Sequence, residues 1–331
     1  MPGTVRGKVR YNVLDLSVKP EDRGLFSGPA HKYSEDIEVD LYDPASTPGI
    51  VQGPEGLDVQ GFTYVKHQSA LDVDEWLHGE NPEEAYVKEV EELVQQVTGA
   101  KKVVVNHLGI RKRLAANNQD PKFYRKAGDK HDQAVQKLTK KESAWGEFTS
   151  HPQLSGKQDA GLEPARFAHC DYTLQGLKRT ARYCRKDITA AAQEALDAED
   201  RHGDAKRYAA YSVWRPLKPI KRDPLAVADW RTTDKSTLQP IEYRATSNVV
   251  DKGEYMLEQY TQSPEAKNTA QRWYCMANQT PEDVLILKFA DTASEKEARI
   301  AAHCAHCSPM LNGVDNEEPR MSVEARVLAF W

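Results

Sequence analysis

Short apolar runs separated by turns fill the chain after about Trp145, and they constrain its fold more than any other feature. The runs expected as strands cover residues 165–172, 208–217, 225–230, 271–276, 284–289 and 323–331. One helical crossover is expected over residues 174–198. Many short strands with few helices between them favour a β-barrel or sandwich over a parallel α/β sheet.

The N-terminal part, to about residue 145, is more mixed. Residues 61–65 and 102–106 are expected as strands, and residues 82–98 as a helix with an apolar stripe that ends at Gly99. Residues 111–144 are highly charged and are expected to form an exposed loop and helix. We therefore predict a single domain over residues 1–331, with 1–145 as a mixed α/β extension and 146–331 supplying most of a β core.

The composition excludes several classes of protein. A formal net charge of -5 provides no basic field for nucleic acid, and the sequence has no apolar run long enough to cross a membrane. The N-terminus lacks the apolar segment of a signal peptide. Five cysteines without framework spacing are typical of reduced thiols, so a cytoplasmic protein is expected.

One of three His-x-acid triplets stands out as a candidate metal site. With ten histidines and 50 acidic residues, chance alone gives about 1.5 such triplets. The triplets that begin at His78 and His202 lie in polar turns, whereas His169-Cys170-Asp171 follows an apolar stretch. Residues i and i+2 of a strand share a face, so His169 and Asp171 can chelate one metal while Cys170 points away.

Two segments downstream offer partners for this pair. The run His303-Cys304-Ala305-His306-Cys307 holds four metal-binding side chains; by itself it would be half of a zinc site, but the chain lacks a second pair. Arg320 and Ser322 share one face at the start of the last strand and can grip a carboxylate. The alternative for Arg320 is an edge arginine paired with Glu317 or Glu318.

The arrangement of motifs resembles the non-haem Fe(II)/2-oxoglutarate-dependent oxygenases over about residues 60–331. The resemblance is strongest to the hydroxylase/desaturase group of secondary metabolism, which includes the small component of the cephalosporin 7α-methoxylase system and gibberellin-desaturase-like fungal proteins. The matching stretches are Asn106-His107 with Arg111-Lys112-Arg113, His169-Cys170-Asp171, Trp214-Arg215-Pro216 through Arg222-Asp223-Pro224-Leu225-Ala226, Gln271-Arg272-Trp273-Tyr274 through Gln279-Thr280-Pro281, and Pro319-Arg320-Met321-Ser322-Val323-Glu324-Ala325-Arg326.

This resemblance implies a mainly β fold with flanking helices around a double-stranded β-helix, the jelly-roll or cupin-like core. It implies His169, Asp171 and His303 as catalytic iron ligands, with His306 as the reserve. Arg320 and Ser322 would bind the distal carboxylate of 2-oxoglutarate, with Arg326 as the fallback anchor.

The implied reaction is hydroxylation, desaturation or cyclisation of a small natural-product intermediate. Hydrogen abstraction by a ferryl species would follow the oxidation of 2-oxoglutarate to succinate and carbon dioxide. The retained Asp171 argues against halogenation. Arg215, Tyr274 and His107 are the candidate substrate contacts, with core packing around a satisfied polar group as the alternative for Arg215 and Tyr274. The expected partners are the substrate and dioxygen, not nucleic acid or membrane, and a homodimer is left open. Two alternatives remain: a non-catalytic jelly-roll that binds a metal or ligand, and an iron oxidase that does not use 2-oxoglutarate.

Overall fold

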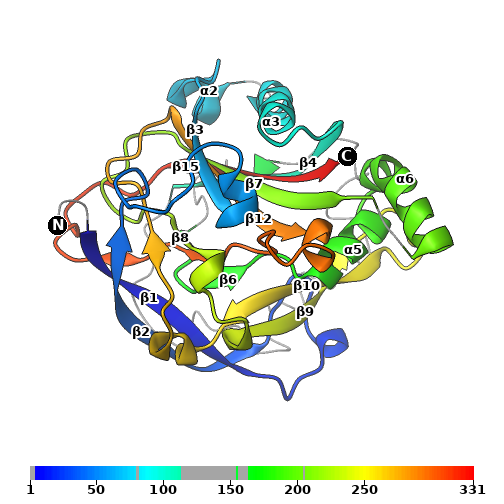
Figure 1. The fold of residues 1–331 in the computed structure, drawn as a ribbon, viewed down its shortest axis with the longest axis horizontal. Helices are drawn as coiled ribbons and strands as arrows, with labels where there is room; N and C mark the ends of the chain where they lie inside the picture. The colour runs from blue at the N-terminus through cyan, green and yellow to red at the C-terminus, as the bar shows by residue number, and fades with distance from the viewer. Residues whose placement is uncertain (1–3, 80–81, 113–153, 156–162, 204–205) are drawn as a thin grey trace.

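Two β-sheets face each other in the computed structural model of the chain, which describes residues 4–79, 82–112, 154–155, 163–203 and 206–331 (Figure 1). The nine-stranded sheet has the order β14 (Met310–Leu311), β1 (Thr4–Asp15), β2 (Ala30–Tyr42), β11 (Trp273–Tyr274), β8 (Ala226–Ala228), β13 (His306–Cys307), β6 (His169–Cys170), β10 (Glu254–Gln262) and β9 (Leu238–Thr246). The six-stranded sheet has the order β3 (Phe62–Lys66), β12 (Asp283–Asp291), β7 (Tyr208–Pro216), β15 (Ser322–Phe330), β4 (Lys102–Arg111) and β5 (Leu154–Ser155).

Helices cover one face and one end of this sandwich. In the described residues the α-helices are α1 (Gly56–Val59), α2 (Val73–His78), α3 (Pro82–Thr98), α5 (Leu174–Tyr183) and α6 (Lys186–His202). Short 3-10 helices span Pro20–Asp22, Trp230–Thr232, Lys235–Thr237, Pro264–Asn268 and Thr292–Glu295. In Figure 1, α2 and α3 lie on the outer side of the six-stranded sheet, and α5 and α6 lie at one end. The predicted β architecture with flanking helices is therefore confirmed.

The central strands of the six-stranded sheet are buried on both faces. On β15, Leu328 and Phe330 point inward to a core between the sheets, and Val327 and Ala329 point outward to a second core under α3. This double burial explains the nearly continuous apolar runs in the sequence. The helix predicted over residues 82–98 is confirmed as α3, and Gly99 ends it with a positive φ of 71°.

The predicted crossover over residues 174–198 is broken into two helices. The break lies at Arg185, whose backbone is extended and whose guanidinium donates to the carbonyls of Val105 and Asn106 on β4. These hydrogen bonds to β4 break the helix at a point where the local helix propensity alone would extend it. α5 packs so closely over β10 that a side chain at Gly176 would collide with the carbonyl of Glu258.

The N-terminal part contributes strands to both sheets. β1 and β2 form a long antiparallel pair in the nine-stranded sheet, and β3 and β4 belong to the six-stranded sheet. We did not predict β1 and β2, because many charged side chains interrupt their apolar pattern. Most of the predicted loop and helix over residues 111–144 lies outside the described residues.

Candidate functional site

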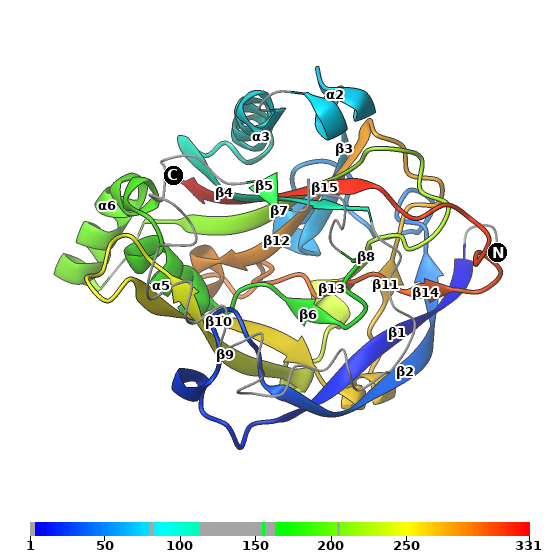
Figure 2. The ribbon, with the colours of Figure 1, turned by 180° about the vertical axis from the view of Figure 1, so that it is seen from behind.

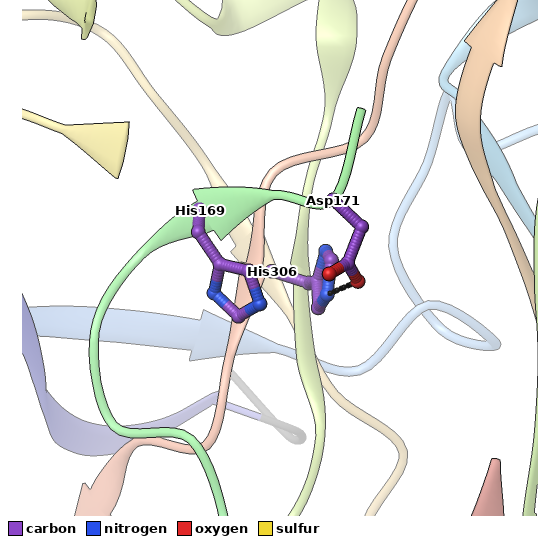
Figure 3. A group of neighbouring side chains, drawn as sticks. All are labelled: His169, Asp171 and His306. Carbon is purple, nitrogen blue, oxygen red and sulfur yellow. Dashed lines mark ion pairs between the residues drawn. The ribbon is translucent and has the colours of Figure 1, made fainter. Parts of the chain in front are cut away.

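Three buried side chains converge between the sheets: His169 on β6, Asp171 just after it, and His306 on β13 (Figure 3). Their potential ligand atoms all lie within 4.8 Å of one another. β6 and β13 are antiparallel neighbours in which His306 pairs directly with His169, and Figure 2 shows the two strands side by side. The extended backbone turns Asp171 to the same side as His169, as the triplet predicts. Cys170 packs in the core on the other face of the sheet.

Backbone carbonyls orient both imidazoles. His169 Nδ1 lies 2.8 Å from the carbonyl oxygen of Phe167, and His306 Nδ1 lies 3.1 Å from that of Cys304. With Nδ1–H donated to a carbonyl, each ring presents its unprotonated Nε2 to the centre of the site. Burial, with the nearby His306, lowers the pKa of His169 to about 4, which keeps this ring neutral at physiological pH.

The two oxygens of Asp171 have different surroundings. Oδ1 lies 3.1 Å from Nη2 of Arg326. Oδ2 lies 3.3 Å from Nε2 of His306, and no hydrogen bond to this buried oxygen is made by any described residue. Burial alone would raise the pKa of Asp171, but the Arg326 guanidinium and the histidines hold it well below its usual range. An ionised carboxylate with one free oxygen beside two imidazoles fits a divalent iron with open positions.

His303 is not part of this group, and our choice of His303 over His306 is corrected. His303 Nδ1 lies 2.8 Å from the carbonyl oxygen of Phe289, and its ring meets Trp230 and Tyr260 edge-on at centroid distances of 5.6 and 5.2 Å. Only His306 of the two histidines lies on a strand that pairs with β6. The zinc alternative also finds no support, because the group of potential ligands in the described residues contains no cysteine.

A buried basic side chain lines the same cavity. Arg320 is 4% exposed and lines the cavity together with the three potential ligands and Trp214. Its Nη1 donates to the carbonyl of Asp223 at 2.7 Å, while Nε and the hydroxyl of Ser322 have no partner among the described residues. Burial and the neighbouring Arg111 lower the pKa of Arg320 to about 9, which indicates a cation without a full counter-charge.

The alternative for Arg320, a surface pair with Glu317 or Glu318, is wrong. Glu317 lies 3.6 Å from Lys221, and Glu318 lies 4.0 Å from Lys218. Arg320 instead points into the sandwich, with its guanidinium 5.3 Å from the ring of Trp214. A buried guanidinium with a free N–H and an unpartnered hydroxyl nearby can receive a carboxylate.

Arg326 lies on the inner face of β15 and lines the same cavity as Arg320, and its guanidinium pairs with Asp171. Glu324, two residues earlier on the same face, lies 3.7 Å from Arg326 and accepts a hydrogen bond from Ser212. We did not predict Glu324; the period-two spacing of Ser322, Glu324 and Arg326 was the signal for it.

The three candidate substrate contacts lie in different places. Arg215 points outward, where its donors meet Tyr86 and the carbonyls of His67 and Pro281, so the structure favours the packing alternative over the substrate contact for this residue. The reason is strand alternation, which turns Trp214 inward and Arg215 outward. Tyr274 is buried in the inner core against Phe62.

His107 lies beside the site. It faces Arg326 across the β4–β15 pairing, where a β-bulge shifts the register. Burial and Arg326 lower the pKa of His107 to about 4. Bulges of this kind often redirect side chains next to active sites.

Comparison with known proteins identifies the family. Residues 52–330 match the family model described as an oxidoreductase/YMDC permease-like domain. The gibberellin cluster GA4 desaturase of Gibberella fujikuroi is 30% identical over 83% of this chain and 82% of its own. The Fe(II)/2-oxoglutarate-dependent dioxygenase nvfI of Aspergillus novofumigatus is 29% identical over 51% of this chain and 53% of its own.

A solved structure has the same fold. A variant of the iron and alpha-ketoglutarate-dependent endoperoxidase NvfI aligns with a TM-score of 0.63 and 21% identity, covering 100% of this chain and 98% of its own. This likeness confirms the jelly-roll core expected from the sequence. The chain therefore belongs to the family of this oxidoreductase model, and it is an Fe(II)/2-oxoglutarate-dependent oxygenase of the hydroxylase/desaturase group.

Proposed function

We propose that His169, Asp171 and His306 hold Fe(II), and that Arg320 with Ser322 binds the distal carboxylate of 2-oxoglutarate. The observation that carries this proposal is one cavity lined both by the three potential ligands and by a buried, incompletely paired guanidinium. Two imidazoles and one carboxylate on a single side leave the remaining positions of an iron open.

When bound, iron with 2-oxoglutarate and dioxygen supplies the oxidant that removes a hydrogen from the substrate, with succinate and carbon dioxide as co-products. The chain's own residues prepare this step by binding and orientation. The carbonyls of Phe167 and Cys304 fix the imidazoles, and Arg326 compensates the charge of Asp171. Because a carboxylate occupies the third protein position, no halide can take its place, which favours oxygenation or desaturation over halogenation.

Binding of 2-oxoglutarate requires the side chains around the cavity to move. The cavity measures about 20 Å³, which is room for a single water and not for a dicarboxylate. Arg111 and Arg326 have the most exposed of the charged lining side chains, at 21% and 28%. We expect Arg111 to rotate when the co-substrate enters, while Arg326 stays paired with Asp171.

For the substrate we propose a small natural-product intermediate. Support comes from the relatives in biosynthesis, among them the GA4 desaturase of the gibberellin cluster. His107 is the proposed substrate contact with the strongest structural support, because it adjoins Arg326 on the inner face. Tyr274 remains a second proposal, from its place in the inner core.

Location and assembly are also proposals. None of the helices in the described part of the chain has the length and apolarity needed to span a bilayer. We propose a cytoplasmic enzyme of one domain over residues 1–331 that acts on its substrate without nucleic acid, with a homodimer as the assembly to test by light scattering.

Anaerobic addition of Fe(II) and 2-oxoglutarate tests the function. We expect a visible charge-transfer band with the native protein and none with the His169→Ala/Asp171→Ala double variant. A native protein without the band would contradict the use of 2-oxoglutarate and favour an oxidase or a non-catalytic binding protein. Once the band is established, substrate-triggered succinate release provides the screen for the substrate.

A further inference from the structure

Arg326 connects the two sheets at the proposed metal ligand Asp171. Arg326 lies on β15 of the six-stranded sheet, and Asp171 follows β6 of the nine-stranded sheet. The 3.1 Å contact between Nη2 and Oδ1 is the ion pair that the described residues offer this carboxylate besides His306. The Asp171 side chain is 5% exposed, so the pair is largely shielded from water.

Surrounding residues hold the guanidinium of Arg326 in this position. Glu324 Oε1 lies 3.7 Å from its Nε, and Ser212 donates to that same Oε1 at 3.2 Å. The ring of Phe289 lies below the guanidinium, with its centroid 5.8 Å from Cζ. Neighbouring strands flank Arg326 on both sides, since it pairs with Ser212 of β7 and His107 of β4. A side chain fixed in this way can impose one orientation on its partner.

The contact makes the two oxygens of Asp171 inequivalent. Arg326 engages Oδ1, whereas Oδ2 faces Nε2 of His306 and accepts no hydrogen bond from the described residues. If both oxygens bound the metal, the carboxylate would fill one of the positions that a bidentate keto acid and dioxygen need. The number of open positions therefore depends on which oxygens of Asp171 remain free.

We propose that Arg326 is a positioning residue that holds Oδ1 of Asp171 and so keeps this carboxylate monodentate toward the metal, an inference that rests on the ligand set proposed above. Arg326 touches neither the metal nor 2-oxoglutarate in this role. It acts through Asp171, and Glu324 with Ser212 keeps it in place.

Loss of the Arg326 guanidinium should affect the binding of a divalent cation and of 2-oxoglutarate differently. Removing the guanidinium takes a positive charge away from the metal, so a divalent cation binds at least as tightly as in the native protein. Freed Oδ1 can then also bind the metal, so 2-oxoglutarate must compete for a position and binds more weakly. A purely structural role predicts weaker binding of both, because a disordered site loses both ligands together.

The test compares native protein with Arg326→Gln, Arg326→Lys and Arg215→Gln. Mn(II) affinity is measured from the electron paramagnetic resonance signal of free Mn(II). The affinity for 2-oxoglutarate is measured by anaerobic titration of the Fe(II) protein, followed by the visible charge-transfer absorption. Arg215→Gln is the matched control, because it removes a buried arginine from the same sheet on the face away from the ligands. Circular dichroism verifies the fold of each variant.

We expect Arg326→Gln to bind Mn(II) no less tightly and 2-oxoglutarate about tenfold or more weakly. Arg326→Lys should lie between Arg326→Gln and native protein, and Arg215→Gln should match native protein for both ligands. Unchanged 2-oxoglutarate affinity in Arg326→Gln, or equal loss of both affinities, would overturn the proposal. If Arg326→Gln does not fold, Arg326→Lys decides by the same criteria. Native protein that binds neither ligand would instead refute the proposed function.

Discussion

His303 and His306 lie three residues apart, yet their surroundings give them different roles. Both are buried, and both have Nδ1 within hydrogen-bond distance of a backbone carbonyl. Around His306 the neighbours are His169, at a ring-centroid distance of 4.3 Å, and Asp171. Around His303 they are the rings of Trp230 and Tyr260. Pairing with β6, and not the local sequence, therefore determines which histidine can be a ligand.

The largest expected effect separates the two histidines in turnover. We expect His306→Ala to reduce succinate formation roughly a hundredfold or more, because it removes a proposed metal ligand, which should cost more than losing a residue that only supports one. His303→Gln should retain most of the native rate, since its ring contacts no proposed ligand. Added imidazole should restore part of the activity of His306→Gly. Equal losses of succinate formation in His306→Ala and His303→Gln would contradict the different roles assigned to the two histidines.

Arg320 extends the comparison to the second proposed binding group in the cavity that His306 lines. We expect Arg320→Leu to weaken 2-oxoglutarate binding about 10- to 100-fold, because a charge-assisted hydrogen bond is worth roughly 1.5–3 kcal/mol. Ser322→Ala should weaken it only a few-fold. The visible titration of the anaerobic Fe(II) complex gives both constants. If Arg320→Leu bound 2-oxoglutarate as well as native protein, the anchor would lie elsewhere.

Acid should weaken the fold through the buried histidines. The pKa values of His107, His169 and His303 lie at about 4 in the fold, below the ordinary 6.5, chiefly because burial disfavours the charged rings. At a pH between about 4 and about 6.5, the unfolded chain binds more protons than the native one. The free energy of unfolding therefore falls as the pH falls through this range.

Urea midpoints at about pH 7 and pH 5 measure this dependence. His303→Gln should make the difference between the two midpoints smaller, because it removes one of the rings whose pKa is lowered by burial. It should leave Mn(II) affinity at neutral pH unchanged. An unaltered pH dependence would show that His303 is not a buried neutral ring.

The smallest expected effect concerns the aromatic surroundings of His303. Trp230→Leu removes one edge-to-face contact, which is worth about 0.5–1.5 kcal/mol beyond the buried area. We expect a modest decrease in the free energy of unfolding, with Mn(II) and 2-oxoglutarate affinities unchanged. Denaturant titration and the two binding assays check this expectation. A large loss of metal affinity would mean that the two regions are coupled.

Much of the fold was predictable where the local pattern and the tertiary structure agree. The apolar stripe of α3 and the doubly buried strands β7, β12 and β15 have clear sequence patterns. β1 and β2 were not predicted, because charged side chains at their exposed positions interrupt the apolar pattern expected of strands. The break at Arg185 depends on hydrogen bonds to β4, about 80 residues away in the sequence.

The site was predictable in its chemistry but not in every residue. Two pairs of proposed site residues are spaced two apart, so each pair shares one face of a strand: His169 with Asp171, and Arg320 with Ser322. The choice of His306 depends on the register between β13 and β6, which no local spacing reveals. The contact between Arg326 and Asp171 depends in the same way on how the two sheets face each other.

The most direct test of the account is the anaerobic Fe(II)/2-oxoglutarate spectrum of two matched variants, His306→Ala and His303→Ala. Each removes one buried imidazole from the same short segment, so their effects on folding are comparable. We predict that His303→Ala keeps the charge-transfer band and that His306→Ala loses it. A band that persists in His306→Ala and disappears in His303→Ala would contradict the assignment of His306 as the third ligand.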